Sequence, residues 1–538
     1  MSAYGAKMLT LQRFMRRFAH LTILLLMLTP LAGRAQGNRI VYGLSFEPSG
    51  FDPHRNASSE LGIPLRQVYD TLVYRDPDTG AYVPGLASSW EVAPDGLAYT
   101  FTLRQDVVFH DGTPFNALAV AANLDRIVDP AVASQKAVFM LGPYAGYQIV
   151  DDFTIRILLA APYSSLLDSL SQVYLGIASP AALSSVSIDR YQFNQVGSGP
   201  YEFVEYVTGD RVVIRRAANY TWGPAFYEAP ESGAIDEVEF RFYGDPTARA
   251  LALEAGDAEV MGELLPLDAR ALSLDEDIIL KQVTIPGQPL QFLINTTRFP
   301  TGSLPVRQAL LFGTNREAIV ESVFQRFSPV AWGPLAATTT FYTPTVQGSY
   351  PYDIARARAL LEGAGLRDAD GNTFFDADGG DLTIRVIVPP WGLIPEVAQL
   401  LQDQWRSIGI RAELVPVATR AALFEAVSGG NYNLVAWYEF GSDPAFLSNY
   451  FATDGTLNWT GYSNPLLDSL LGQASASQDE TTRAALYTQV QQLIMEDALI
   501  LPIRDYVNVV GMRSSMVGLN FDYYGWFPLL MNASLVFG

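Results

Sequence analysis

Few residues of this chain have the types and the spacing that catalysis needs. Its three histidines are His20, His54 and His110. His110 precedes Asp111 and could act as a general base beside a carboxylate. Neighbouring residues on a strand point to opposite faces, however, and this segment runs into a tight turn, so a structural role is expected for His110.

Ser198 is the second residue with a catalytic reading, because it lies between two glycines. A nucleophile elbow needs glycines two residues before and two residues after the serine, where this chain has Val196 and Pro200. The sequence also has no H-E-x-x-H, no G-x-x-x-x-G-K-[ST] and no G-x-G-x-x-G motif. No catalytic residue is therefore predicted, and the chain is expected not to be an enzyme.

Carboxylates are plentiful, and one group of them suggests a calcium loop. The group is Asp368, Asp370, Asn372, Asp376, Asp378 and Asp381. Counted from Asp368, Thr373 stands where the loop needs glycine and Gly379 where it needs glutamate. A solvated turn is expected instead, with no metal and no cofactor. An exported hydrolase with a carboxylate pair is the alternative from another functional class, although no spacing singles out such a pair; a turnover assay would decide between the two.

The strongest ligand-binding pattern is a strand that ends in a Gly-Ser-Asp-Pro loop, residues 434–444. In α/β folds, ligands bind at the carboxyl ends of strands. The candidates in this segment are Trp437, Tyr438, Glu439, Phe440 and Asp443. Trp332 and Trp391 stand at other predicted loops, and Glu47 follows the first strand. Core packing is the commoner fate of any one aromatic residue, but as a set they predict a wide aromatic cleft.

Helix and strand patterns alternate through much of the chain. Residues 39–45 read as a first strand, and residues 97–109 alternate with period two. Asp353 is a predicted N-cap for a helix over residues 355–361. Helices starting at Pro395 and at Ala421 are each followed by a predicted strand, which indicates an α/β lobe with a mostly parallel sheet.

Composition limits the class of protein further. The 538 residues suffice for two to four domains, and 49% of them are hydrophobic. Lys plus Arg number 35 against 56 Asp plus Glu, a net charge of −21, so a nucleic-acid partner is not expected. The absence of cysteine excludes disulfides, thiolate metal sites and a lipid-anchored cysteine.

The N-terminus has the pattern of an export signal. Basic residues precede the apolar run 21–28, and Gly33-Arg34-Ala35 provides small residues for cleavage. The run is shorter than the roughly 18 apolar residues of a membrane span. We therefore predict a signal peptide over residues 1–35, cleaved near Ala35, and a periplasmic protein; the alternative is a permanent anchor helix. The export route, Sec or twin-arginine, stays open.

Nine sequence blocks follow one another in an order that matches one known family. They are residues 82–91, 94–96, 99–104, 108–115, 197–201, 219–223, 306–310, 355–365 and 461–465. With these blocks the chain resembles the extracytoplasmic solute-binding proteins (family 5) of peptide-type ABC importers, and the resemblance covers nearly the whole chain after residue 35. Residues 82–115 are similar to the family's PxLAxSW…PDG…YTFxLRxxVxFHDGxPF signature, which is specific.

The resemblance implies a two-lobed clamshell with an extra subdomain in its first lobe. By analogy, residues 36–59, 187–288 and 501–538 build the first lobe, residues 60–186 the extra subdomain and residues 289–500 the second lobe. Two chain crossings near residues 285–292 and 499–504 form the hinge. Such a hinge lets rigid lobes close over a ligand, and the closed form is what the permease recognises.

The resemblance also bears on the ligand. Peptide binders of the family have a Trp where this chain has Trp437, and three residues later an Asp that pairs with the peptide's terminal ammonium. This chain has Phe440 there, followed by the matching Asp443-Pro444. Glu439, one residue earlier, substitutes for that Asp only if the loop bends, because neighbouring residues on a strand point to opposite faces. Tyr506 follows the second crossing, where oligopeptide binders have a cleft tyrosine.

We therefore expect a monomeric, periplasmic binding subunit of an ABC importer that delivers a small peptide-like or other oligomeric solute to permease subunits. An oligosaccharide or another solute without an amine is the alternative within the family. Nickel-chelate and haem ligands are disfavoured, because the two histidines after residue 35 lie in framework segments.

Overall fold

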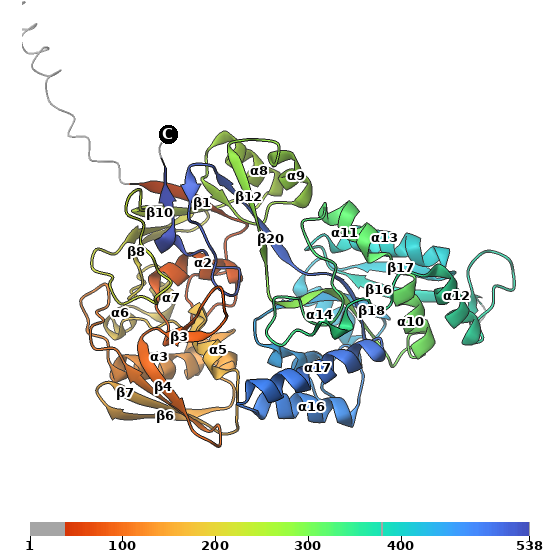
Figure 1. Ribbon diagram of the computed structural model, residues 1–538, viewed down its shortest axis with the longest axis horizontal. Coiled ribbons are helices and arrows are strands. Elements are labelled where there is room, and N and C mark those ends of the chain that lie inside the picture. Colours follow the sequence, from red (N-terminus) through yellow and green to blue (C-terminus); the bar gives the residue numbers. More distant parts are fainter. Residues whose placement is uncertain (1–37, 378–379, 537–538) are drawn as a thin grey trace, which may run out of the picture.

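Two mixed β-sheets organise the chain in the computed structural model, which describes residues 38–377 and 380–536 (Figure 1). The predicted signal peptide lies outside the described residues. The larger sheet has the strand order β12 (Ile278–Thr284), β20 (Val507–Arg513), β11 (Val260–Met261), β1 (Arg39–Leu44), β10 (Glu237–Phe242), β9 (Arg211–Arg216) and β8 (Tyr201–Val207). The smaller sheet has the order β17 (Arg411–Pro416), β16 (Thr383–Val388), β18 (Leu434–Phe440), β13 (Gly287–Ile294) and β19 (Ile500–Arg504).

A third, antiparallel sheet is inserted into the chain between β1 and β8. Its strand order is β4 (Ala87–Val92), β5 (Ala98–Leu103), β7 (Thr154–Leu159) and β6 (Tyr144–Asp151). Three strand pairs complete the set: β2 (Val73–Arg75) with β3 (Tyr82–Pro84), β14 (Asp376–Ala377) with β15 (Gly380–Asp381), and β21 (Met516–Val517) with β22 (Ser534–Leu535). Below, the first lobe is the part built on the larger sheet and the second lobe the part built on the smaller sheet. The name extra subdomain is kept for residues 60–186, the bounds predicted from the sequence, and the antiparallel sheet lies within them.

Helices cover these sheets. Those of the first lobe and the extra subdomain are α2 (Ser59–Val68), α3 (Ala117–Val128), α4 (Ala137–Met140), α5 (Leu166–Leu170), α6 (Pro180–Ser185), α7 (Ile188–Tyr191), α8 (Pro246–Ala255) and α9 (Pro266–Leu272). Those of the second lobe are α10 (Leu304–Phe312), α11 (Arg316–Phe324), α12 (Ile354–Gly363), α13 (Ile394–Ser407), α14 (Arg420–Ser428), α15 (Leu447–Phe451), α16 (Pro465–Ala476) and α17 (Glu480–Glu496). Short 3₁₀ helices lie at Pro130–Val132, Val173–Leu175, Pro344–Val346, Pro444–Phe446 and Leu530–Asn532.

Local sequence rules account for many of these elements. The Asp353 carboxylate accepts a hydrogen bond from the Arg356 backbone N–H at 2.8 Å and caps α12, as predicted. In α13 the buried residues recur at helical spacing, and the positive φ of Gly409 ends the segment before β17. The second-lobe sheet is mixed, however, rather than mostly parallel. β16 pairs in parallel with β17 and β18, whereas β13 pairs antiparallel with β18 and β19 because β13 enters from the other lobe.

The two lobes are joined where two strands continue from one sheet into the other. β12 leads into β13 through Ile285 and Pro286, and β19 leads into β20 through Asp505 and Tyr506. The crossings run side by side, since the Ile285 N–H donates a hydrogen bond of 2.9 Å to the Tyr506 carbonyl. In Figure 1, β20 runs between the two halves of the molecule. A two-strand connection of this kind can hinge with little backbone change.

Each lobe has a hydrophobic core of its own. One buried cluster combines β1 and β10 of the first lobe with β5 and β7 of the extra subdomain, so these two parts pack as one body. A separate cluster fills the second lobe around β13, β16, β18 and α13. Independent cores allow the lobes to move as rigid units about the crossings.

Candidate functional site

The end of β18 opens onto two cavities. Its first residues, Leu434 to Trp437, are buried, and its last three, Tyr438 to Phe440, are half-buried. A cavity of about 350 Å³ is lined by Trp391, Arg420, Trp437, Tyr438, Glu439 and Phe440. Glu439 and Phe440 also line a second cavity of about 150 Å³ between the lobes. The cavities therefore adjoin at these two residues. They lie at the carboxyl end of the strand that the sequence predicts to bind a ligand.

Glu439 lines the same cavities as Phe440, which strict alternation along a strand does not allow. The register between β18 and β13 shifts between Gln288 and Gln291, and the pairing ends at Phe440. An irregularity of this kind twists a strand and re-aims its side chains. The extra residue of this bulge lies in β13, opposite Tyr438, whereas Glu439 and Phe440 stay paired with Gln288 and Gly287. A bend that brings the Glu439 carboxylate to a ligand stays a prediction.

A chain of hydrogen bonds orients the Glu439 carboxylate. The Trp437 indole N–H donates to the Tyr450 hydroxyl at 2.8 Å, and that hydroxyl donates to Glu439 Oε2 at 2.8 Å. Burial and the nearby carboxylate of Glu439 raise the pKa of Tyr450, so its phenol stays protonated and remains a donor. Trp437 itself is 5% exposed, packs edge-to-face against Trp459 and presents only its margin to the cavity.

The smaller cavity is walled by segments from both lobes and from the first crossing. Its lining residues are Ala57, Ser59, Lys136, Gln172, Tyr174, Ile285, Pro286, Glu439, Phe440, Gly441, Tyr524, Trp526 and Phe527. Sequence reasoning missed the wall that the first lobe and the extra subdomain provide. Two signals could have found it. Lys136 is one of three lysines in the chain, and Trp526 ends an aromatic run, Tyr523-Tyr524-Gly525-Trp526.

Lys136 is the basic residue of this smaller cavity. Its ammonium lies 3.9 Å from the ring centroid of Tyr174. Burial lowers the pKa of Lys136 to about 8, against the opposing effect of the Glu439 and Asp168 carboxylates. The side chain is therefore mostly protonated at neutral pH.

Aromatic rings connect the lobes beside the crossings. Phe440 stacks on Trp526 with ring centroids 5.4 Å apart and meets Tyr506 edge-on at 4.8 Å. Tyr506 also lies 5.5 Å from the ring of Tyr438, and its hydroxyl donates to Glu263 at 2.8 Å. Phe440 thus has three aromatic partners in this conformation, because its ring also lies 5.2 Å from that of Tyr438. Trp391, which is half-buried, is the aromatic residue of the larger cavity that stacks on no other ring among the described residues.

The other predicted ligand-binding residues are engaged within the protein. Asp443 is buried and accepts two hydrogen bonds, at 2.9 and 2.8 Å, from Arg483. Trp332 lies 4.2 Å from the Arg316 guanidinium and packs on the second-lobe core. Glu47 accepts hydrogen bonds from the Tyr206 hydroxyl and the Gly209 N–H. These three and Tyr506 do not line either cavity among the described residues, and their contact with a ligand stays a prediction.

Polar contacts also hold the extra subdomain against the second lobe. Arg75 and Asp168 form a buried ion pair at 2.7 Å, and Ser442 of the second lobe lies within hydrogen-bond distance of both. Farther along, the Ser164 N–H and hydroxyl both donate to the Ser475 carbonyl, at 3.1 and 2.9 Å. The structure is therefore one in which the two lobes touch beyond the crossings.

The residues that invited a catalytic reading have structural partners. His54 is fully buried and His110 is partly exposed; the ring Nε2 of each lies 2.9 Å from a backbone carbonyl, that of Gly176 and Gly199 respectively. The Ser198 hydroxyl donates to Asp70 at 3.0 Å. Neither histidine lines either cavity.

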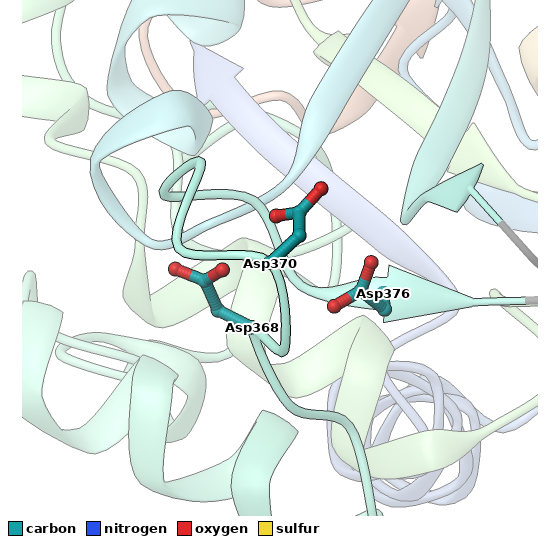
Figure 2. A group of neighbouring side chains, drawn as sticks. All are labelled: Asp368, Asp370 and Asp376. Carbon is teal, nitrogen blue, oxygen red and sulfur yellow. The ribbon is translucent and has the colours of Figure 1, made fainter.

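The acidic loop of the second lobe brings Asp368, Asp370 and Asp376 close together (Figure 2). Their carboxylates accept hydrogen bonds from backbone N–H groups of the same loop, such as Gly371 to Asp368 at 2.8 Å and Asn372 to Asp370 at 3.0 Å. These are the bonds of Asx turns, which such residues form without an ion.

Across the described residues, no helix has the length and hydropathy required to cross a membrane.

Comparison with known proteins identifies one family and several related binding proteins. The family model described as bacterial extracellular solute-binding proteins, family 5, matches residues 81–458. The glutathione-binding protein GsiB of Escherichia coli O1:K1 / APEC is 30% identical over 433 residues, 78% of this chain and 79% of that protein. Di/tripeptide-binding protein 1 of Pseudomonas aeruginosa (strain UCBPP-PA14) is 27% identical over 523 residues, 91% and 93% of the two chains.

A solved structure is similar over almost the whole chain. NikA from Brucella suis in complex with Fe(III)-EDTA has a TM-score of 0.82 at 23% identity, covering 93% of this chain and 100% of that one. At this identity the likeness shows the fold alone. It confirms the predicted two-lobed α/β architecture.

Proposed function

Because the chain belongs to family 5 of the bacterial extracellular solute-binding proteins, we propose that it is the substrate-binding subunit of an ABC importer. It holds a peptide-like solute between its two lobes and delivers it to permease subunits. The observation that carries the proposal is the smaller cavity, which is lined by Lys136 and Trp526 from the extra subdomain and the first lobe, by Glu439 and Phe440 from the second lobe, and by Ile285 and Pro286 at the first crossing.

This placement explains how binding is coupled to transport. A solute that contacts both walls and the hinge binds the closed form better than the open form, so it shifts the equilibrium toward closure. The permease then distinguishes loaded from empty protein by the shape of the whole molecule. No step of this cycle needs catalysis, and the named relatives are binding proteins rather than enzymes.

A peptide-like solute is supported by Glu439. A buried ammonium needs a nearby anion, and Glu439 lines both cavities although Phe440 occupies the position of the family's usual Asp. The names of two relatives, a glutathione-binding and a di/tripeptide-binding protein, point to the same ligand class. An oligosaccharide remains the second candidate, because Trp391 and Tyr438 give the larger cavity rings on which a sugar could stack.

The proposal includes export to the periplasm, removal of residues 1–35 and a monomeric state. Family membership supports an extracytoplasmic location. No catalytic role is assigned to any residue, and a turnover assay with peptides and oligosaccharides checks this: product formation would contradict the proposal.

The decisive experiment is mass spectrometry of the solute that co-purifies with the protein, followed by small-angle scattering with and without that solute. We expect a small peptide-like molecule and a decrease in radius of gyration on binding. A radius that stays the same at saturation would contradict the closing mechanism.

A further inference from the structure

Lys136 forms no ion pair with any of the residues that the structure describes. Among residues 38–377 and 380–536, its ammonium also forms no hydrogen bond, although it is half-buried in the wall of the smaller cavity. Its one close contact is the face of the Tyr174 ring. An ammonium withdrawn from water in this way gains most from an anion, because a cation–π contact recovers only part of the lost hydration.

Two carboxylates, those of Asp168 and Glu439, act on the pKa of Lys136, and both accept hydrogen bonds from other residues. Asp168 accepts hydrogen bonds from Arg75, Gln172, Ser442 and Tyr524. Glu439 lines the same cavity from the second lobe, and its Oε2 accepts from Tyr450. One cavity is thus lined by a cation of the extra subdomain and by an anion of the second lobe.

We propose that Lys136 binds a carboxylate of the solute, so that the cleft selects a zwitterion with its carboxylate at Lys136 and its ammonium at Glu439. This inference rests on the proposed function and narrows its ligand class to short peptides with free ends or acidic side chains. A neutral sugar would leave both charges without a partner. The adjoining larger cavity provides room for the side chains of such a peptide.

The arrangement also gives Lys136 a role in closure. Lys136 and Glu439 belong to different parts of the clamshell, so a zwitterion can satisfy both only when the lobes are together. A solute lacking one of the two charges would bridge the walls less well, and it would shift the open–closed equilibrium less.

The experiment uses two pools of random di- and tripeptides, one with free carboxylates and one with C-terminal amides. The full mature protein is incubated with both pools in competition, and retained peptides are quantified by native mass spectrometry. The variants are Lys136→Met, Lys136→Arg and Arg420→Met, the last because Arg420 is the cation of the larger cavity. Lys281→Met is the matched control, since Lys281 bonds to Leu519 and Asn520 and lines neither cavity.

We expect wild type to retain free acids over amides by about tenfold, the value of one charge-assisted pair. Lys136→Met should lose this preference while still retaining peptides, Lys136→Arg should keep part of it, and Lys281→Met should behave as wild type. A preference that survives in Lys136→Met, or that disappears in Arg420→Met instead, would overturn the assignment of Lys136. Failure of wild type to retain any peptide would instead contradict the proposed function itself.

Discussion

The Ser442 hydroxyl of the second lobe donates a hydrogen bond to the Asp168 carboxylate of the extra subdomain, although 274 positions separate the two residues. Arg75 also donates to both, at 2.7 Å to Asp168 and 3.0 Å to Ser442. Arg75 and Asp168 belong to the same part of the clamshell, whereas Ser442 belongs to the second lobe. If the lobes separate as proposed, the Arg75–Asp168 pair would stay together and the two hydrogen bonds of Ser442 would break.

We expect Ser442→Ala to shift the protein toward the open form. Loss of hydrogen bonds to charged partners costs about 1.5–3 kcal/mol, and this cost falls on the closed state alone. The radius of gyration of the empty protein should increase, and solute affinity should fall about tenfold or more. Ser428→Ala, at the exposed end of α14, serves as the control. Scattering curves that match wild type would show that this contact does not hold the lobes together.

Glu439→Gln should separate the two ligand classes. If an ammonium binds there, replacing the carboxylate leaves a buried charge unpaired, and affinity for unblocked tripeptides should fall by about 100-fold. Binding of a neutral oligosaccharide should change little. Calorimetry on this variant and on Glu425→Gln, an exposed glutamate of α14, gives the comparison. Tight binding of an unblocked tripeptide by Glu439→Gln would mean that the ammonium has another partner.

Trp437→Ala and Trp391→Ala should differ in stability although both residues line the larger cavity. Trp437 is 5% exposed and donates to Tyr450, so its truncation should cost about 3–5 kcal/mol of unfolding free energy. Trp391 is half-buried, and its truncation should weaken solute binding with a much smaller loss of stability. Urea unfolding and calorimetry on both variants test this. Equal losses of stability would contradict the burial difference.

Glu60→Gln should change how stability depends on pH. Burial and the neighbouring Glu263 raise the pKa of Glu60 from 4.5 to about 8, against the hydrogen bond from Ser45 and the charge of Arg249. Between these values the folded protein holds a proton that the unfolded chain has lost, so stability falls as the pH rises from about 4.5 to 8.

The neutral glutamine removes this contribution and can still accept from Ser45. The variant should therefore gain about 1–3 kcal/mol relative to wild type at pH 8 compared with pH 5. Urea unfolding at the two pH values measures the difference. Glu254→Gln, exposed on α8, should leave the dependence unchanged. A wild-type slope retained in Glu60→Gln would show that Glu60 is ionised in the fold.

The N-terminus provides a separate test of export. The mature protein should begin near Gln36 and fractionate with periplasmic proteins, because small residues flank the predicted cleavage point and no cysteine is present for lipid attachment. N-terminal sequencing of protein purified from the native cell checks this. A chain that still begins at Met1 or Met8 would contradict the prediction.

The sequence alone was enough to identify the family and the α/β class. Signature blocks and helix signals such as Asp353 and Gly409 depend on near neighbours, which a sequence displays directly. The same local reasoning placed Trp437, Tyr438, Glu439 and Phe440 at a strand end, where the structure has both cavities. The prediction of a mostly parallel sheet in the second lobe was wrong, because β13, which enters from the first lobe, runs antiparallel to both of its neighbours.

Only the tertiary structure decided which of these residues are free to meet a solute. Asp443 is matched to Arg483 and Phe440 to Trp526, and each pair joins segments that local patterns do not relate. The bulge of β13 opposite Tyr438 arises where β13 enters the second lobe, so it depends on pairing between strands that are distant in the sequence. Lys136 is a candidate ligand-binding residue only because the fold brings it into the same cavity as Glu439. Periodicity and capping depend on a few neighbouring residues, whereas a cleft is assembled from segments hundreds of residues apart. The role of a charged side chain in a cleft therefore depends on distant groups that local patterns do not show.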